Sequence, residues 1–279
     1  MKKGILILLV ISLFLDVYSQ TGIDLAKEMV ATCKSFKTLS FTLEKEERIK
    51  GKMKGDKAFN KIQISPKKIY HKQEYPKEGL EFLYLEGQND NKALINTNGF
   101  PWVNVSLEPY GSQMRENQHH TLHKLGFESM ADILGHLLDK YEEQSENMIQ
   151  ITGSTTWDGR DCYVLKMENP NFVYEQYVVK AGENLIDIAQ ARQLSEHMIL
   201  EANKHMDFYY DVRPNQIIKI PGDYAKSMEL YLDKTRKIPL MIKVYDDKGL
   251  YEHYKYYDVS INPTFTNEDF SSENSKYGF

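Results

Sequence analysis

The stretch Tyr177-Val178-Val179-Lys180-Ala181-Gly182-Glu183-Asn184-Leu185-Ile186-Asp187-Ile188-Ala189 contains, in order, the signals for a strand, a tight turn and a helix. The adjacent valines favour a short strand, and Gly182 allows the sharp turn because glycine tolerates a positive φ. Asn184 is a good N-cap, since its side-chain oxygen can accept a backbone N–H of the next helix. The helix that follows has one apolar face, because its apolar residues recur at i, i+3 and i+4: Leu185, Ile188 and Ala189.

The residues up to Pro221 complete a small unit. Ser195 is expected to cap a second helix over Glu196–Asn203. The segment Arg213-Pro214-Asn215-Gln216 predicts a turn in which the asparagine takes a left-handed conformation. A closing strand is predicted over 217–220, and Pro221 ends it. The predicted order is therefore strand, helix, helix, strand.

This unit resembles a LysM domain, and we expect it to occupy residues 176–221. The family has a βααβ fold and binds glycans that contain N-acetylglucosamine, such as peptidoglycan or chitin. Two positions depart from the family pattern: Asn215 stands where glycine is usual, and Asn184 where threonine or serine is common. The resemblance rests on a co-linear set of residues: Tyr177, Val179, Gly182, Leu185, Ile188, Ala189, Ser195, Ile199, Asn203, Pro214, Gln216, Ile218, Ile220 and Pro221.

The resemblance implies a glycan site between the first strand–helix loop and the last helix–strand loop. The module carries nearly balanced charges, which suits an uncharged sugar. A module of this shape that has lost glycan binding and serves as a spacer or protein contact stays as the alternative. The residues expected to form the site are Ala181, Gly182, Glu183, Asn184, Leu185, Asn203, Met206, Asp207 and Phe208.

Strand signals lie on both sides of this module and predict one antiparallel sheet that it interrupts. Amphipathic helices are expected over Ile23–Phe36 and Phe127–Tyr141. Short alternating segments predict many strands, including Phe100–Leu107. The dense charge of Glu44–Lys54 predicts a solvated strand end or hairpin, and Pro263 is expected to start a tail without a core.

The outer segments, 20–175 and 222–279, resemble the LolA/LolB-like superfamily of outer-membrane lipoprotein-sorting proteins. The features are the leading helix with its strand meander and the closing block Tyr231–Phe270, which contains Leu232-Asp233-Lys234 and Asn262-Pro263. The resemblance extends to secreted envelope proteins that combine this domain with an inserted LysM. It implies an α+β fold: a LolA-like curved antiparallel half-barrel with helices, plus the βααβ insert. The cup of that fold would hold a lipid or lipoprotein acyl chain. The apolar stripe of Phe127–Tyr141 is either core or cavity lining.

Residues 1–19 predict a signal peptide. Lys2 and Lys3 precede the apolar run Ile5–Leu15, and Val17-Tyr18-Ser19 predicts cleavage before Gln20. A retained membrane anchor is the alternative. Export would place the protein in the periplasm or cell envelope, an oxidising compartment. There Cys33 and Cys162 could form a disulfide or stay as buried thiols, and the sequence leaves both open.

The formal net charge of −5 argues against a nucleic-acid partner. His119 and His123 are four residues apart, but a His-Glu-x-x-His order is missing from the sequence, so we expect polar surface histidines, no metal site and no cofactor. The sequence also lacks a Gly-x-Ser-x-Gly motif. We expect a non-enzymatic exported protein that binds peptidoglycan. The alternatives are a peptidoglycan-processing enzyme and a non-binding envelope scaffold.

Overall fold

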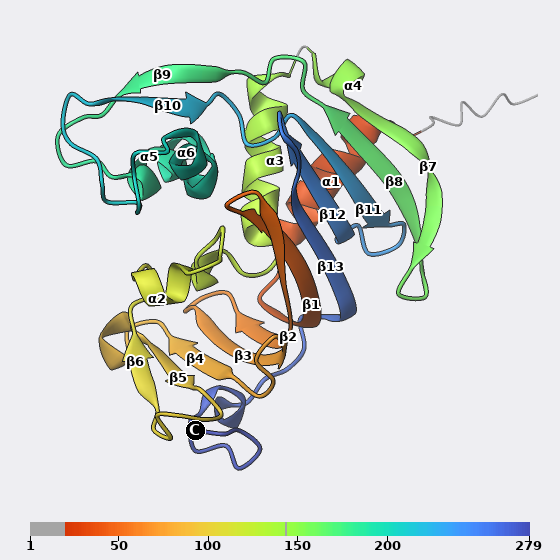
Figure 1. Cartoon of the computed structure of the whole chain (residues 1–279). Helices are drawn as coiled ribbons and strands as arrows, with labels where there is room; N and C mark the ends of the chain where they lie inside the picture. Colours follow the sequence, from red (N-terminus) through yellow and green to blue (C-terminus); the bar gives the residue numbers. More distant parts are fainter. Residues whose placement is uncertain (1–19, 143) are drawn as a thin grey trace, which may run out of the picture.

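Antiparallel strands form one open, curved sheet of 11 strands in this computed structural model, which describes residues 20–142 and 144–279 (Figure 1). The strand order is β6-β5-β4-β3-β2-β1-β13-β12-β11-β8-β7. The first and the last strand in the sequence lie next to each other in the middle of the sheet, where β1 pairs with β13 from Leu39↔Ile261 to Glu47↔Glu252. The expected signal peptide at 1–19 lies outside the described residues.

The strands of this sheet are β1 (Thr38–Ile49), β2 (Lys52–Gln63), β3 (Lys68–Tyr75), β4 (Glu81–Leu85), β5 (Ala93–Asn96), β6 (Val105–Leu107), β7 (Ile149–Trp157), β8 (Arg160–Glu168), β11 (Ser227–Asp233), β12 (Pro239–Asp246) and β13 (Gly249–Ile261). The remaining elements outside the insert are α1 (Gly22–Lys34), α2 (Ser112–Arg115), α3 (Glu128–Lys140), α4 (Ser145–Met148) and the 3₁₀ turns η1 (Asn89–Asn91), η2 (Leu122–Lys124) and η3 (Asn267–Phe270).

Two helices, α1 and α3, cover one face of the sheet and enclose the main core with it (Figure 1). Both helix predictions are confirmed. A capping box between Thr21 and Asp24 starts α1. Phe127, at the start of α3, packs against Phe41 of β1 and Tyr256 of β13 with ring centroids 6.0 and 4.6 Å apart. The side chains of these helices therefore pack with those of the two central strands, β1 and β13, in one hydrophobic core.

The insert forms its own small unit, with β9 (Tyr174–Val178), α5 (Leu185–Arg192), α6 (Glu196–Ala202) and β10 (Ile217–Pro221). Its two strands pair antiparallel, and Asn184 caps α5 as predicted. Asn215 has a φ of 66°, the left-handed conformation that the turn requires. The insert leaves the sheet after β8 and returns at β11, and these two strands pair with each other. Its ends are thus held close together, while the domain limits at 20–175, 176–221 and 222–279 stay a prediction.

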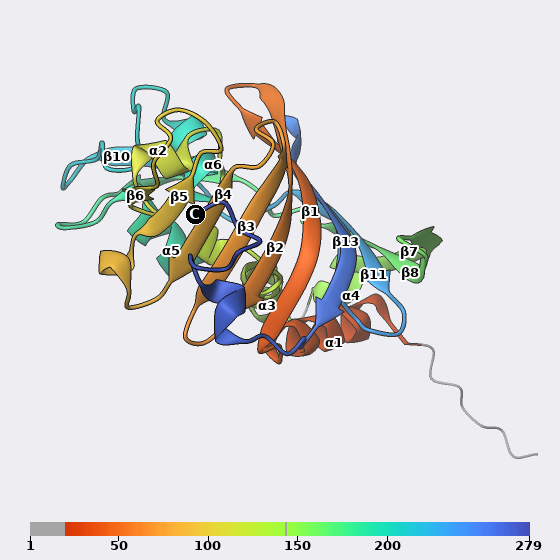
Figure 2. The ribbon, with the colours of Figure 1, turned by 90° about the horizontal axis from the view of Figure 1, so that it is seen from below.

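Two expectations about polar and terminal segments are wrong. The charged hairpin is not wholly solvated, because Glu47 and Arg48 are buried with exposed fractions of 2% and 7%. The tail after Pro263 also has a core: the tail lies on the face of the sheet that the helices leave open (Figure 2). Phe270 and Tyr277 pack there beside Tyr70. Glu47 and Arg48 are consecutive and point to opposite faces of β1, and partners far away in the sequence bury each of them: His119 for Glu47 and Asp246 for Arg48. A composition argument does not reveal such partners.

The strand predicted over Phe100–Leu107 is shorter than expected, since only Val105–Leu107 pairs with β5. Pro101 lacks the N–H that a ladder needs, and Trp102 has a φ of 63°. The residues before β6 form an exposed loop instead, in which Phe100 is 83% exposed.

Cys33 in α1 and Cys162 in β8 are buried free thiols. Burial raises the pKa of Cys33 to about 12 and that of Cys162 to about 11. Of the two states left open by the sequence, the thiol form is present. In the described part of the chain, no helix combines the length and the apolar character needed to cross a bilayer.

Candidate functional site

The two loops expected to hold a glycan lie side by side at one end of the insert. The backbone N–H of Leu185 donates to the carbonyl oxygen of Tyr209 at 2.9 Å and joins them. Glu183 fixes the first loop, because its carboxylate accepts from Lys180 N–H at 2.8 Å and from the Tyr177 hydroxyl at 2.9 Å. These hydrogen bonds fix the shape of the first loop and hold it against the second.

The predicted glycan residues divide by exposure. Ala181, Gly182 and Asp207 are exposed, and Glu183, Asn184 and Phe208 are half-buried. The side chains of Leu185, Asn203 and Met206 are buried. Asn203 connects α6 to β10, since its amide donates to the carbonyls of Ile199 and Lys219 at 2.7 Å each. The three buried side chains therefore support the loops, and the six exposed or half-buried residues are the ones that solvent reaches.

One exposed residue of the second loop escaped the sequence analysis. Tyr210 is 50% exposed, and its ring centroid lies 5.8 Å from that of Phe208. Its neighbour Tyr209 is 2% exposed. The aromatic run Phe208-Tyr209-Tyr210 indicates in the sequence that rings lie in this loop, but it does not indicate which of them is exposed to solvent. An exposed ring beside the loops offers a flat apolar surface of the kind that amphipathic ligands use.

The insert meets the rest of the molecule through buried charged groups. Glu196 of α6 pairs with Arg115 at 3.2 Å and with Lys124 at 3.0 Å. The Arg115 guanidinium also lies 4.3 Å from the centroid of the Tyr209 ring. The hydroxyls of Ser195 and Tyr251 are 2.8 Å apart. These contacts fix the position of the insert against the segment before α3 and against β13.

His119 lies at the centre of this interface and is fully buried. Its ring stacks between His197 and Tyr251, with centroids 4.4 and 4.2 Å away. Nδ1 lies 2.8 Å from a Glu252 oxygen and Nε2 lies 2.9 Å from the Arg48 carbonyl oxygen. Both partners can only accept, so the geometry suits a doubly protonated ring. The expectation that His119 is a surface residue is wrong.

The two stacked histidines have opposite pKa shifts. Burial alone would lower the pKa of His119, but the Glu47 charge and the hydrogen bond to Glu252 outweigh it and raise that pKa. Burial, together with the charge of His119, holds the pKa of His197 well below its usual value. Burial would raise the pKa of Glu47, yet Lys45 and His119 lower it to about 2. These shifts favour the cationic form of the His119 ring and the neutral form of the His197 ring.

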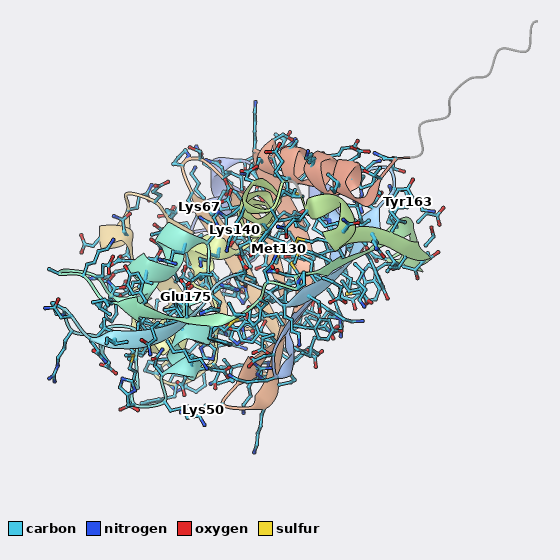
Figure 3. The ribbon with its side chains drawn as sticks, turned by 90° about the horizontal axis from the view of Figure 1, so that it is seen from above. Lys50, Lys67, Met130, Lys140, Tyr163 and Glu175 are labelled. Carbon is cyan, nitrogen blue, oxygen red and sulfur yellow. The ribbon has the colours of Figure 1, made fainter. Side chains whose placement is uncertain are left out.

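A cavity of about 300 Å³ opens between the sheet and the segment 113–126. Inward residues of β1, β2 and β3 form one wall, and Met130 and Ile133 of α3 form part of the other. Met130 lies near the middle of the molecule (Figure 3). The apolar stripe of α3 thus fills both roles that the sequence left open, because its other residues Leu134, Leu137 and Leu138 belong to the core.

The four histidines singled out from the sequence do not form one cluster. His123 stacks on Tyr110 with centroids 5.4 Å apart, and His136 is exposed on α3. Within residues 20–142 and 144–279, no group of His, Cys, Asp or Glu has the arrangement of a metal site. His119 and His120 instead share the carboxylate of Glu252.

Solved structures similar to this chain share little sequence with it. A DUF1329 family protein from Desulfovibrio piger is 11% identical with a TM-score of 0.34, over 90% of this chain and 96% of that one. An outer membrane lipoprotein-sorting protein domain from Vibrio parahaemolyticus is 11% identical with a TM-score of 0.33, over 90% and 96%. LprF from Mycobacterium bovis is 10% identical with a TM-score of 0.43, over 88% and 94%. At these values the likeness carries no conclusion about ligand or activity. No curated protein matches the sequence.

Two family models match the sequence. The LysM domain model matches residues 177–221, which confirms the resemblance found in the sequence. The model described as "Protein of unknown function (DUF1571)" matches residues 36–198 and 203–279, so it spans most of the sheet and most of the insert. The chain belongs to the DUF1571 family and carries a LysM domain within the matched range.

Proposed function

We propose that this chain is a non-catalytic protein of the cell envelope with two binding sites. Its LysM domain binds peptidoglycan through N-acetylglucosamine, and its cavity holds a lipid or a lipoprotein acyl chain. The observation that carries the proposal is the joining of the two LysM loops into one exposed surface, with Ala181, Gly182 and Asp207 facing solvent.

The glycan proposal is supported by the chemistry of this surface. Gly182 has a φ of 83°, and a Cβ placed there would meet no atom within 4 Å, so the backbone at this point is open to a ligand. Half-exposed Tyr210 beside Phe208 adds an aromatic surface at the same loop. Backbone amides and a ring face together suit an N-acetyl sugar, which is polar at its edges and apolar on its faces.

The lipid proposal is supported by the position and lining of the cavity. Met130 and Ile133 of α3 face the inner surface of the sheet, where Phe82 and Ile95 also line the space. A volume of about 300 Å³ lies at the lower end of the range for small-molecule sites. A cavity of this size with apolar residues on both walls suits an acyl chain.

Sedimentation with purified peptidoglycan tests the glycan site. Ala181→Trp places a bulky ring on the exposed loop, and Ala191→Trp makes the same change at an exposed position of α5 outside both loops. We expect recovery in the pellet to fall about tenfold for the first variant and to stay unchanged for the second, because only the first blocks the loop surface. Equal recovery of both variants would place the glycan elsewhere.

Mass spectrometry of lipids extracted from the natively purified protein tests the cavity. We expect an amphiphile in stoichiometric amount. Met130→Trp would fill the cavity from α3, and it should reduce that amount while the far-ultraviolet circular dichroism spectrum stays native. Recovery of no lipid from the native protein, with none taken up from added lipids, would refute the lipid half of the proposal.

A further inference from the structure

Three turns at one end of the large sheet carry exposed apolar side chains. Strands β1 to β6 pair in sequence order as an antiparallel meander, so alternate turns lie at the same end of the strands (Figure 2). The turns after β1, β3 and β5 share this end, and we call residues 50–54, 75–79 and 98–104 the aromatic rim. The exposed large apolar residues of the rim are Met53, Tyr75, Phe100, Trp102 and Val103.

The third turn of the rim holds its rings in solvent. Phe100 is 83% exposed and Trp102 is 80% exposed. The Trp102 backbone N–H donates to the Gly99 carbonyl oxygen at 2.7 Å, which closes the turn. The Asn98 side-chain amide donates to the Glu78 carbonyl oxygen at 3.1 Å and joins the third turn to the second. Exposed rings that follow one another on a turn of defined shape indicate a binding surface, unlike single apolar residues scattered over a protein.

The ionisable side chains of the rim are mostly basic, although the chain has a formal net charge of −5. Glu78 is the one acidic residue within the three segments of the rim, and it is exposed. Lys50 lies at the border of the molecule (Figure 3). Lysines beside an anionic bilayer are attracted to its head groups, and aromatic rings collect at the boundary between head groups and acyl chains. The basic residues of the rim are all exposed: Lys50, Lys52, Lys54 and Lys77.

The rim adjoins the cavity between the sheet and segment 113–126. Gln73 and Leu80 flank the second turn and both line the cavity, and the Gln73 backbone N–H donates to the Leu80 carbonyl oxygen at 2.8 Å. Ile95 of β5 and Leu107 of β6, the strands that the third turn connects, also line it. The exposed apolar side chains of the rim, all within the described residues, are not part of the cavity wall. Rim and cavity are therefore neighbours that can be mutated separately.

We propose that the aromatic rim binds the surface of an anionic lipid bilayer. Phe100, Trp102 and Val103 enter the boundary between head groups and acyl chains, and the lysines of the rim contact anionic head groups. The protein then takes its lipid from this bilayer into the adjoining cavity. That last step rests on the proposed lipid function, whereas the binding of the rim to the bilayer does not.

Tryptophan fluorescence tests this contact, because the chain has two tryptophans, Trp102 and Trp157. Trp157 is half-buried, and its Nε1 donates to the Tyr256 carbonyl oxygen at 3.0 Å. Trp157→Phe leaves Trp102 as the reporter. Vesicles of phosphatidylethanolamine with phosphatidylglycerol should shift its emission to shorter wavelength, because the ring leaves water. Trp102→Phe is the matched control, and the emission of the remaining Trp157 should stay unchanged with the same vesicles.

Co-sedimentation of the purified protein with these vesicles measures the affinity. Val103→Ser should weaken binding about fivefold, because the polar side chain gains less from leaving water. Val173→Ser makes the same change outside the rim, at a side chain that is 60% exposed against 62% for Val103, and should leave the affinity unchanged. Lys50→Gln combined with Lys52→Gln should weaken binding about tenfold and remove the preference for these vesicles over pure phosphatidylcholine.

The outcomes separate this inference from the proposed lipid function. Unchanged Trp102 emission, with no protein in the vesicle pellet, would overturn the inference and leave lipid binding in the cavity intact. Equal weakening by Val103→Ser and Val173→Ser would also overturn it. Trp102 emission that lies at short wavelength without vesicles and moves to longer wavelength on dilution would show that a second copy of the chain covers the rim instead. Vesicle binding by a protein that yields no lipid would refute the lipid function and support the inference.

Discussion

The exposed LysM loops and the cavity between the sheet and segment 113–126 are two candidate sites built in opposite ways. The first comes from nearby residues, since Glu183 accepts from Lys180 three positions earlier and Asn184 caps the helix that follows it. The second combines groups from distant segments, such as Glu47 of β1 and Ile242 of β12, around one cavity. A local site shows in the sequence as a motif, whereas a site made by tertiary packing does not. The difference also predicts that the two sites respond differently to mutation.

The largest loss in the free energy of unfolding is expected when the buried carboxylate of Glu252, which both His119 and His120 contact, is removed. Glu252→Ala removes the acceptor for both rings and for the Tyr224 hydroxyl. Breaking such a buried network should cost about 3–5 kcal/mol in the free energy of unfolding. Urea denaturation followed by tryptophan fluorescence measures it.

Glu229→Ala is the matched control for this variant. Glu229 accepts from Lys243 at 2.8 Å on the partly exposed surface of β11 and β12. Its removal should cost less than about 1 kcal/mol. Similar losses in the two variants would contradict the account of a buried, coupled interface.

The fold and the LysM loops were predictable because their signals are periodic and local. The α3 stripe and the Asn184 cap follow directly from spacing. Glu47 and Arg48 were not predictable, since their partners His119 and Asp246 lie far away in the sequence. The pairing of Phe270 with the outer face of the sheet was hidden for the same reason.

The second prediction concerns pH and the cavity wall. Burial, with the nearby Lys45 charge, lowers the pKa of His71 to about 3. Its Nδ1 lies 2.9 Å from the Asn60 side-chain oxygen, which holds the neutral tautomer. A histidine with a lowered folded pKa binds its proton more readily in the unfolded chain. The stability that neutral His71 contributes should therefore be full above about pH 6.5 and decline as the pH falls toward 3; the lowered pKa of His197 adds to this decline, and the raised pKa of His119 opposes it.

His71→Gln should flatten this decline, because the substituted side chain does not titrate. Urea unfolding at pH 7, 6, 5 and 4 gives the slope for each protein. His205→Gln, at an exposed position of the LysM domain, is the control and should keep the wild-type slope. The depressed pKa of Glu47 acts in the same direction only below about pH 4.5, so the test is read above that value. An unchanged slope in His71→Gln would refute the assignment.

The smallest loss of stability is expected when the side chain that caps α5 in the LysM domain is removed. Asn184 accepts from Ile186 N–H at 2.8 Å and from Asp187 N–H at 3.2 Å. Asn184→Ala should cost about 1 kcal/mol, as for other N-caps. Hydrogen exchange of α5 amides measures the local loss, which should leave α3 protection unchanged. Equal loss of protection in both helices would show that the LysM domain does not open on its own.

One measurement tests the central claim that an exposed glycan site and a buried lipid site work in the same molecule. The full chain is loaded with a labelled acyl lipid and sedimented with purified peptidoglycan. We predict that protein and lipid enter the pellet together, and that Ala181→Trp keeps both in the supernatant with the lipid still bound. Pelleting of Ala181→Trp at the wild-type level, or release of the lipid when the wild-type protein reaches the peptidoglycan, would contradict the account.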